Sequence, residues 1–300
     1  MKIEELKTLQ PIVFQRFLTI LEQNRLAHAY LFSGDFASYD MAIFLSQSLF
    51  CQEKAGVLPC QNCRTCRLIE AGEFSDVTLL TPQGNIIKTE TVRELVKNFS
   101  QSGFESSKQV FIIRDSEKMH ANAANSLLKV IEEPQSDIHI FLLTNQEEAV
   151  LPTIKSRTQI IGFPKNLPAL ERMLEEEGLL KSDAMILARL VSSQDEARKL
   201  AENKSFLDLI GQSKKFIDLL LLNPNQAYLQ VGTLVALAVE KAEQDRLFDL
   251  LSLLLAEKMM EPLAREKMDM VLKAKLMWQA NVSLQNSLEY MTLLKTSIHK

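Results

Sequence analysis

Residues 29–41 read AYLFSGDFASYDM, and this stretch decides the fold of the first half of the chain. The apolar run Ala29–Ser33 is rich in Tyr, Leu and Phe, as buried strands are, and it ends at Gly34. The residues after the glycine favour a helix. A strand, a tight turn and a helix in this order are typical of the first unit of an α/β domain.

Four more short apolar runs predict buried strands, because they are enriched in Val, Ile and Phe. They are Asp76–Leu80, Gln109–Arg114, Ile138–Thr144 and Thr158–Phe163. Helical patterns lie between them. A capping box from Thr91 to Glu94 predicts one helix start, and an apolar stripe through Leu127 and Ile131 predicts a second helix that ends before Pro134. Alternating strands and helices predict a parallel sheet covered on both faces.

The chain of 300 residues is long enough for two or three domains, and its character changes after Pro164 and Pro168. We expect an α/β domain over residues 1–165, a small helical domain over 166–204 and a helical bundle over 205–300. The bundle helices are expected at Ser205–Leu222, Asn225–Lys241, Asp245–Met260 and Glu261–Gln279.

Charge and hydropathy exclude several classes of protein. The 34 basic and 38 acidic residues give a net charge of −4, and neither half of the chain is basic, which argues against a protein that coats DNA. The first ten residues, MKIEELKTLQ, are charged throughout and do not resemble a signal peptide. No apolar run approaches the roughly 20 residues of a spanning helix. We expect a soluble, cytoplasmic protein with no membrane contact.

All four cysteines lie within an inserted module, residues 51–66, with the spacing C-x8-C-x2-C-x2-C: Cys51, Cys60, Cys63 and Cys66. Disulfides need an oxidising compartment, and no export signal is present. Four thiolates suffice for a tetrahedral zinc site. Because four protein ligands leave no position for water, the predicted Zn²⁺ is structural. The alternative is a group of four buried free thiols.

The turn after Gly34 lies where a phosphate-binding P-loop, G-x-x-x-x-G-K-[ST], would lie, but three of its positions are changed. Tyr39 stands at the second glycine, Asp40 at the lysine and Met41 at the hydroxyl residue that holds magnesium. A carboxylate 4 Å from a phosphate charge costs about 1 kcal/mol in water and more at lower dielectric. Considered without other features of the sequence, the loop is an ordinary turn between a strand and a helix.

Several stretches resemble the clamp-loader family of AAA+ proteins over roughly residues 6–163. They are LAHAYLF at 26–32, the cysteine spacing, DSEKM at 115–119, NAANSLLKVIEEP at 122–134 and TIKSR at 153–157. The resemblance implies a P-loop NTPase-like AAA+ domain, a small helical lid and a C-terminal helical collar that joins subunits in a ring.

In ATP-hydrolysing members of that family, an Asp-Glu pair supports magnesium and polarises the attacking water. Here the resemblance assigns these places to Asp115 and Ser116, and a serine cannot act as a base at neutral pH. Asn145 matches the nucleotide-sensing polar position. With the P-loop changes, three parts of the machinery are missing, and we expect no ATP hydrolysis by this chain.

The family's Ser-Arg-Cys motif is represented by Ser156, Arg157 and Thr158. The resemblance implies that Arg157 reaches the ATP phosphates held by a neighbouring subunit, as an arginine finger in trans. A guanidinium stays charged and pairs bidentately with phosphate, which suits this role. Without the family context, an arginine at this place would be taken for a surface residue.

With these changes, the resemblance implies a catalytically silent ring member of the DNA polymerase III clamp loader, which loads the sliding clamp in DNA replication. Its implied partners are the ATPase subunits and a delta subunit in a hetero-pentamer, with sliding clamp and primer–template DNA contacted through the assembly. No activity of the isolated chain is expected, since nucleotidyl transfer by the DNA-directed DNA polymerase lies in other subunits. Two alternatives stay open: an active ATPase motor subunit of the same fold, and a zinc-containing nucleic-acid-binding protein.

Overall fold

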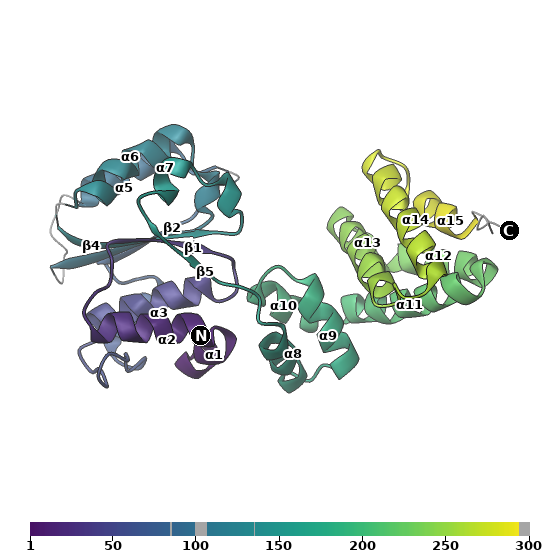
Figure 1. Cartoon of the computed structure of the whole chain (residues 1–300), viewed down its shortest axis with the longest axis horizontal. Helices are drawn as coiled ribbons and strands as arrows, with labels where there is room; N and C mark the ends of the chain where they lie inside the picture. Colours follow the sequence, from purple (N-terminus) through teal and green to yellow (C-terminus); the bar gives the residue numbers. More distant parts are fainter. Residues whose placement is uncertain (85, 100–106, 135, 294–300) are drawn as a thin grey trace. The chain divides into compact units, whose positions relative to one another are not determined.

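A computed structural model describes residues 1–84, 86–99, 107–134 and 136–293 (Figure 1). The chain forms two compact units, Met1–Ala169 and Leu170–Lys300. The first boundary lies within a few residues of the change in character after Pro164. The division of the second unit into a lid and a collar stays a prediction.

The first unit is built on a five-stranded parallel sheet in the order β2-β3-β4-β1-β5. The strands are β1 (Ala29–Ser33), β2 (Val77–Leu80), β3 (Lys108–Ile113), β4 (Asp137–Thr144) and β5 (Gln159–Gly162). Each overlaps a predicted strand. Because all five run the same way, the ends of β1, β3 and β4 meet at one edge of the sheet, and Ser33 pairs with Thr144 there.

Helices cover both faces of this sheet, as predicted (Figure 1). On the face that carries Tyr30, Phe32 and Phe141, the core is shared with the first group of helices. These are α1 (Ile3–Leu9), α2 (Pro11–Glu22), α3 (Ser38–Phe50) and α4 (Arg64–Ala71). The opposite face packs against α5 (Thr89–Phe99), α6 (Ala121–Glu132) and α7 (Pro152–Lys155). Two short 3₁₀ turns, η1 (Ser116–Lys118) and η2 (Glu147–Ala149), follow β3 and β4.

The predicted start of α5 is wrong. The helix begins at Thr89, so Thr91 lies inside its first turn and cannot be the N-terminal cap. Glu90 then stands in the first turn, where a carboxylate is favourable against the helix dipole. The apolar stripe of this helix is confirmed, because Val92 and Leu95 are buried; the side chain of Phe99 lies outside the described residues.

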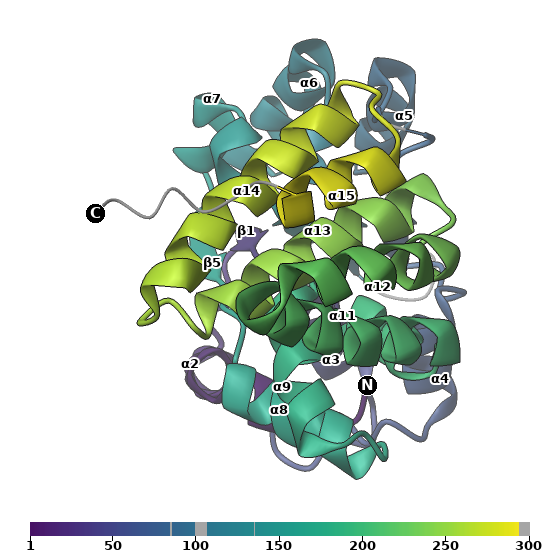
Figure 2. The same ribbon diagram turned by 90° about the vertical axis from the view of Figure 1, so that its right-hand side faces the viewer.

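The second unit is entirely helical, apart from turns, over its described residues. Its helices are α8 (Leu167–Glu176), which begins in the first unit, α9 (Lys181–Leu190), α10 (Gln194–Ala201), α11 (Lys204–Leu222), α12 (Pro224–Leu237), α13 (Lys241–Ala256), α14 (Pro262–Gln279) and α15 (Leu284–Leu293). The last five pack together as a bundle (Figure 2). The ranges of α11 and α14 agree with the predicted ones to within one residue. The other two predicted ranges are displaced: α12 ends four residues before the predicted end, and α13 begins and ends four residues earlier than predicted. Helix α15 was not predicted. No described helix is both long and apolar enough to cross a bilayer.

The side chain of Glu196, in α10, contacts Arg246 in the bundle helix α13. We expect this contact to contribute to stability. Its carboxylate accepts two hydrogen bonds of 2.8 Å from Ser192 and one of 3.1 Å from Arg246. Burial opposes its ionisation, but these donors outweigh burial and lower the pKa of Glu196.

We expect Glu196→Ala to lower the free energy of unfolding by about 1–3 kcal/mol, because three hydrogen bonds to a partly buried, charged acceptor are lost. Since the folded pKa is lowered, this contribution is present above the ordinary glutamate pKa and is lost as pH falls through the folded value. Urea denaturation at several pH values measures it. Glu177→Ala, which removes the exposed pair with Arg198, is the matched control and should change stability by less than about 1 kcal/mol. Equal effects of the two variants would contradict this account of Glu196.

Candidate functional site

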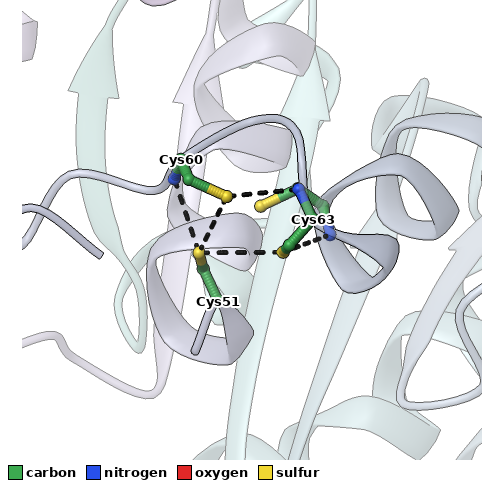
Figure 3. A group of neighbouring side chains, drawn as sticks. Cys51, Cys60 and Cys63 are labelled. Carbon is green, nitrogen blue, oxygen red and sulfur yellow. Dashed lines mark hydrogen bonds between the residues drawn. The ribbon is translucent and has the colours of Figure 1, made fainter. Parts of the chain in front are cut away.

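The four cysteines come together in space, and Figure 3 shows Cys51, Cys60 and Cys63 with their sulfur atoms turned toward one another. Their sulfur atoms all lie within 4.8 Å of one another. The Cys51 sulfur is 3.6 Å from that of Cys60 and 3.9 Å from that of Cys63. Sulfurs held tetrahedrally at about 2.3 Å from a zinc ion lie about 3.8 Å apart. The observed spacing therefore fits four ligands around one metal ion.

Local structure explains how this sequence gathers its thiols. Cys51 directly follows α3, and Cys63 caps the N-terminus of α4, where its sulfur accepts the backbone N–H of Cys66 at 3.4 Å. Between them the chain turns through Gln61, whose φ of 59° is left-handed. The side chain of Gln47 donates to the carbonyl of Cys66 at 3.0 Å, which fixes the module to α3.

Backbone N–H groups also prepare the thiols for a metal. The N–H of Cys63 donates to the Cys60 sulfur at 3.2 Å. The N–H groups of Asn62 and Cys63 lower the pKa of Cys60 to about 7. Burial raises the pKa of Cys63 and Cys66. A cation among the sulfurs would offset that burial, because metal ligands are thiolates.

The second candidate region is the turn from β1 into α3, where the P-loop was expected. Gly34 has a φ of 109°, and a Cβ placed there would lie 2.4 Å from the carbonyl oxygen of Phe163. A glycine is therefore required at this position, because the backbone at the end of β1 lies too close to the backbone after β5 for any side chain. Its presence here has a structural cause that does not involve phosphate.

The space beside this turn is nearly filled. A cavity of about 10 Å³ remains at the edge of the sheet, which is room for about one water molecule. It is lined by Asp35, Ser38, Arg114, Asp115, Leu143, Thr144 and Asn145. The predicted residues Asp115 and Asn145 are thus brought together, but small-molecule pockets typically need about 300–1,000 Å³.

Arg114, which lines this cavity, contacts the ring of Tyr39. The guanidinium carbon of Arg114 lies 4.9 Å from the centre of the Tyr39 ring, a cation–π contact between the end of β3 and the first turn of α3. Burial raises the pKa of Tyr39, with a smaller opposing effect of Arg114. Sequence reasoning missed Arg114, which it placed inside the strand; β3 ends one residue earlier, at Ile113.

Met41 and Asp40 do not face the cavity. Met41 is fully buried in the core beneath the sheet. The carboxylate of Asp40 lies 3.4 Å from the α-amino nitrogen of Met1. Neither side chain lines the small cavity, so the like charge of Asp40 does not lie at its wall.

The end of β3 is held by contacts that the sequence did not indicate. Asp115 has a left-handed backbone with φ 49°, and its carboxylate accepts from Lys118 at 3.3 Å. The hydroxyl of Ser116 is buried without a hydrogen-bond partner among the described residues. Glu117, which was not predicted, accepts from the hydroxyl of Thr144 at 2.7 Å and so ties η1 to the end of β4.

A larger groove of about 520 Å³ lies beside α2 and is lined by residues 9–13, 162 and 164–168. The buried side chain of Gln10 donates to the carbonyls of Phe36 and Pro164, both at 2.8 Å. These two bonds tie the loop after β1 to the chain after β5 along the groove.

The third region carries Ser156 and Arg157, which follow α7. Arg157 is partly exposed, with 36% of its side chain accessible. Its Nη1 donates to the carbonyl of Thr153 at 3.1 Å and to the hydroxyl of Ser156 at 3.2 Å, and its Nε donates to the carboxylate of Glu132. The guanidinium is thus at the surface and held in a defined orientation.

Comparison with known proteins gives consistent matches. A profile of the family described as DNA polymerase III, delta subunit, matches residues 9–166. The DNA polymerase III subunit delta' of Bacillus subtilis is 36% identical over 255 residues, which are 84% of this chain and 77% of that protein. The delta' subunit of Pseudomonas aeruginosa is 34% identical over 160 residues, and the match spans 50% of this chain and about half (49%) of that relative.

Among solved structures, a DNA polymerase III gamma subunit-related protein from Thermotoga maritima superposes with a TM-score of 0.50 at 19% identity. The superposition covers 92% of this chain and 96% of that one. The parallel sheet and this superposition show a P-loop NTPase-like AAA+ fold. The family match defines the class as a clamp-loader subunit of DNA polymerase III. Within this class, the chain belongs to the delta' family.

Proposed function

We propose that this chain is a non-hydrolysing delta' subunit of the clamp loader, which acts in the cytoplasm as a rigid ring member and completes the ATP site of a neighbouring motor subunit. In this proposal its partners are the ATPase subunits and the delta subunit. The assembly opens the sliding clamp and loads it at primer–template junctions, while nucleotidyl transfer belongs to other subunits of the holoenzyme.

The filled turn after β1 carries the first part of this proposal. Only about 10 Å³ is open beside Ser38 and Arg114, and the Arg114–Tyr39 contact holds the turn against the end of β3. The water-polarising carboxylate implied by the family is replaced by Ser116, a buried side chain. These observations support an inert site, and they disfavour the alternative of an active motor subunit.

Arg157 carries the second part. Its guanidinium is accessible at the end of α7, and the surrounding contacts occupy Nε and Nη1. A charged, planar and oriented group of this kind suits a phosphate brought by another subunit. The acceptor in the proposal is the ATP held by the adjacent motor subunit.

The cysteine cluster would hold a structural Zn²⁺. The sulfur spacing and the N–H donors support four-thiolate coordination, which leaves no site for a catalytic water. A bound zinc ion would cross-link the end of α3, the loop that follows it and the start of α4. The net charge of −4 disfavours the alternative of an independent nucleic-acid-binding protein.

Omission and add-back in a reconstituted clamp loader tests the proposal. We expect loaders assembled without this chain to lose clamp loading on primed DNA, and addition of the chain to restore both loading and DNA-stimulated ATP hydrolysis. The isolated chain should hydrolyse no ATP. Full loading by the remaining subunits alone would refute the assigned function.

A further inference from the structure

The contact between Arg157 and Glu132 links two segments that are 25 residues apart in the sequence. Glu132 is the last residue of α6, and Arg157 follows α7. Both side chains are partly exposed, at 36% for Arg157 and 48% for Glu132. The pair therefore lies at the surface of the first unit, where a neighbouring subunit could reach it.

Glu132 is poorly placed for the stability of its own helix. A carboxylate at a helix C-terminus faces the negative end of the helix dipole, which is unfavourable. Glu133, directly after it, adds a second negative charge at the same end. The hydrogen bond from Arg157 offsets this charge, so the contact with Arg157 explains the position of Glu132 better than helix stability does.

Two of the three guanidinium nitrogens of Arg157, Nε and Nη1, donate to neighbouring residues. Nε donates to Glu132, and Nη1 donates to Thr153 and Ser156. No contact of Nη2 is observed within the part of the chain that the structure describes. Since the guanidinium is planar, fixing Nε and Nη1 also fixes the direction of Nη2.

We propose that Glu132 is the positioning residue for Arg157: it holds the guanidinium by Nε so that Nη2 is presented to the phosphate of a neighbouring subunit. This inference rests on the proposed trans-acting role of Arg157. Glu132 itself touches no substrate. It acts by restricting the arginine to one orientation before the neighbour binds ATP, which lowers the entropy that must be lost in the transition state.

A double-mutant cycle in the reconstituted loader tests this role, with Glu132→Gln, Arg157→Ala and both together. We expect Glu132→Gln to reduce the single-turnover rate of ATP hydrolysis about two- to fivefold, the range of a partly exposed ion pair, with little change in the ATP concentration at half-saturation. In the Arg157→Ala background the same change should have no effect. Glu148→Gln, which removes the nearby exposed pair with Lys155, is the matched control and should leave the rate unchanged.

The outcomes separate the two proposals. If Arg157→Ala slows hydrolysis but Glu132→Gln does not, the positioning role is wrong and the arginine finger stands. A similar loss from Glu132→Gln in both backgrounds, or faster hydrolysis with Glu132→Gln alone, would also overturn it. If neither variant changes the rate, Arg157 has no trans-acting role, and the positioning role of Glu132 is then wrong as well. Thermal melting of each isolated variant establishes that it is folded.

Discussion

Replacing Arg157 by alanine should slow ATP hydrolysis by about 10³-fold at the one motor site that borders this chain, the low end of the range for arginine fingers. The expected loss is large because, in the proposed role, the guanidinium stabilises charge that develops on the transferred phosphoryl group. Motor sites that do not border this chain should keep their rate. In a rapid-quench experiment, the amplitude of the fast burst of hydrolysis should therefore fall by the amount that one motor site contributes in each loader.

Arg157→Lys is the matched comparison. Lysine keeps the positive charge but lacks the planar fork, so its Nζ cannot donate to Glu132, Thr153 and a phosphate in the same geometry. We expect a rate between those of the alanine variant and the natural sequence. An unchanged burst in the alanine variant would show that Arg157 completes no ATP site.

Loss of metal from the cysteine cluster should be the largest stability effect in the chain. Cys63→Ser removes one sulfur ligand, whereas the serine hydroxyl can still cap the N-terminus of α4. We expect the first unit to lose more than about 3 kcal/mol of folding free energy, because structural zinc binding in small domains contributes directly to folding. For a unit of this size, this corresponds to a fall of about 10 °C in melting temperature.

Two measurements check this. Metal analysis of freshly purified protein should give one zinc per chain, and scanning calorimetry with and without a chelator should reproduce the Cys63→Ser shift. Thr65→Ser, in the same segment but without a ligand atom in the cluster, is the control and should keep both the metal and the melting temperature. Sub-stoichiometric metal together with an unchanged melting temperature in Cys63→Ser would argue for four free thiols.

The sheet could be predicted from the sequence because its strands are covered on both faces. Such strands are continuous apolar runs, and β1 was placed at both ends correctly as Ala29–Ser33. The cysteine cluster was equally accessible, since its ligands lie within sixteen residues and their spacing limits the geometry. In both cases the information is local in the chain.

The contacts that were missed depend on side chains distant in sequence. Arg114 meets Tyr39 only because β3 ends and α3 begins at the same edge of the sheet. The pairing of Glu132 with Arg157 depends on how α6 and α7 lie on the sheet.

The burial of Lys267 in α14 was also not predicted. Its side chain is 1% exposed, and burial lowers its pKa, although a lysine is normally predicted to face solvent.

Counting the nucleotides bound to the assembled loader tests the central claim most directly. The loader would be equilibrated with a photoreactive ATP analogue and magnesium, cross-linked, digested and mapped by mass spectrometry. The account predicts one bound nucleotide for each motor subunit and no cross-link to residues 34–41 of this chain. A nucleotide cross-linked to residues 34–41 of this chain, and hydrolysed there in the absence of motor-site turnover, would contradict it.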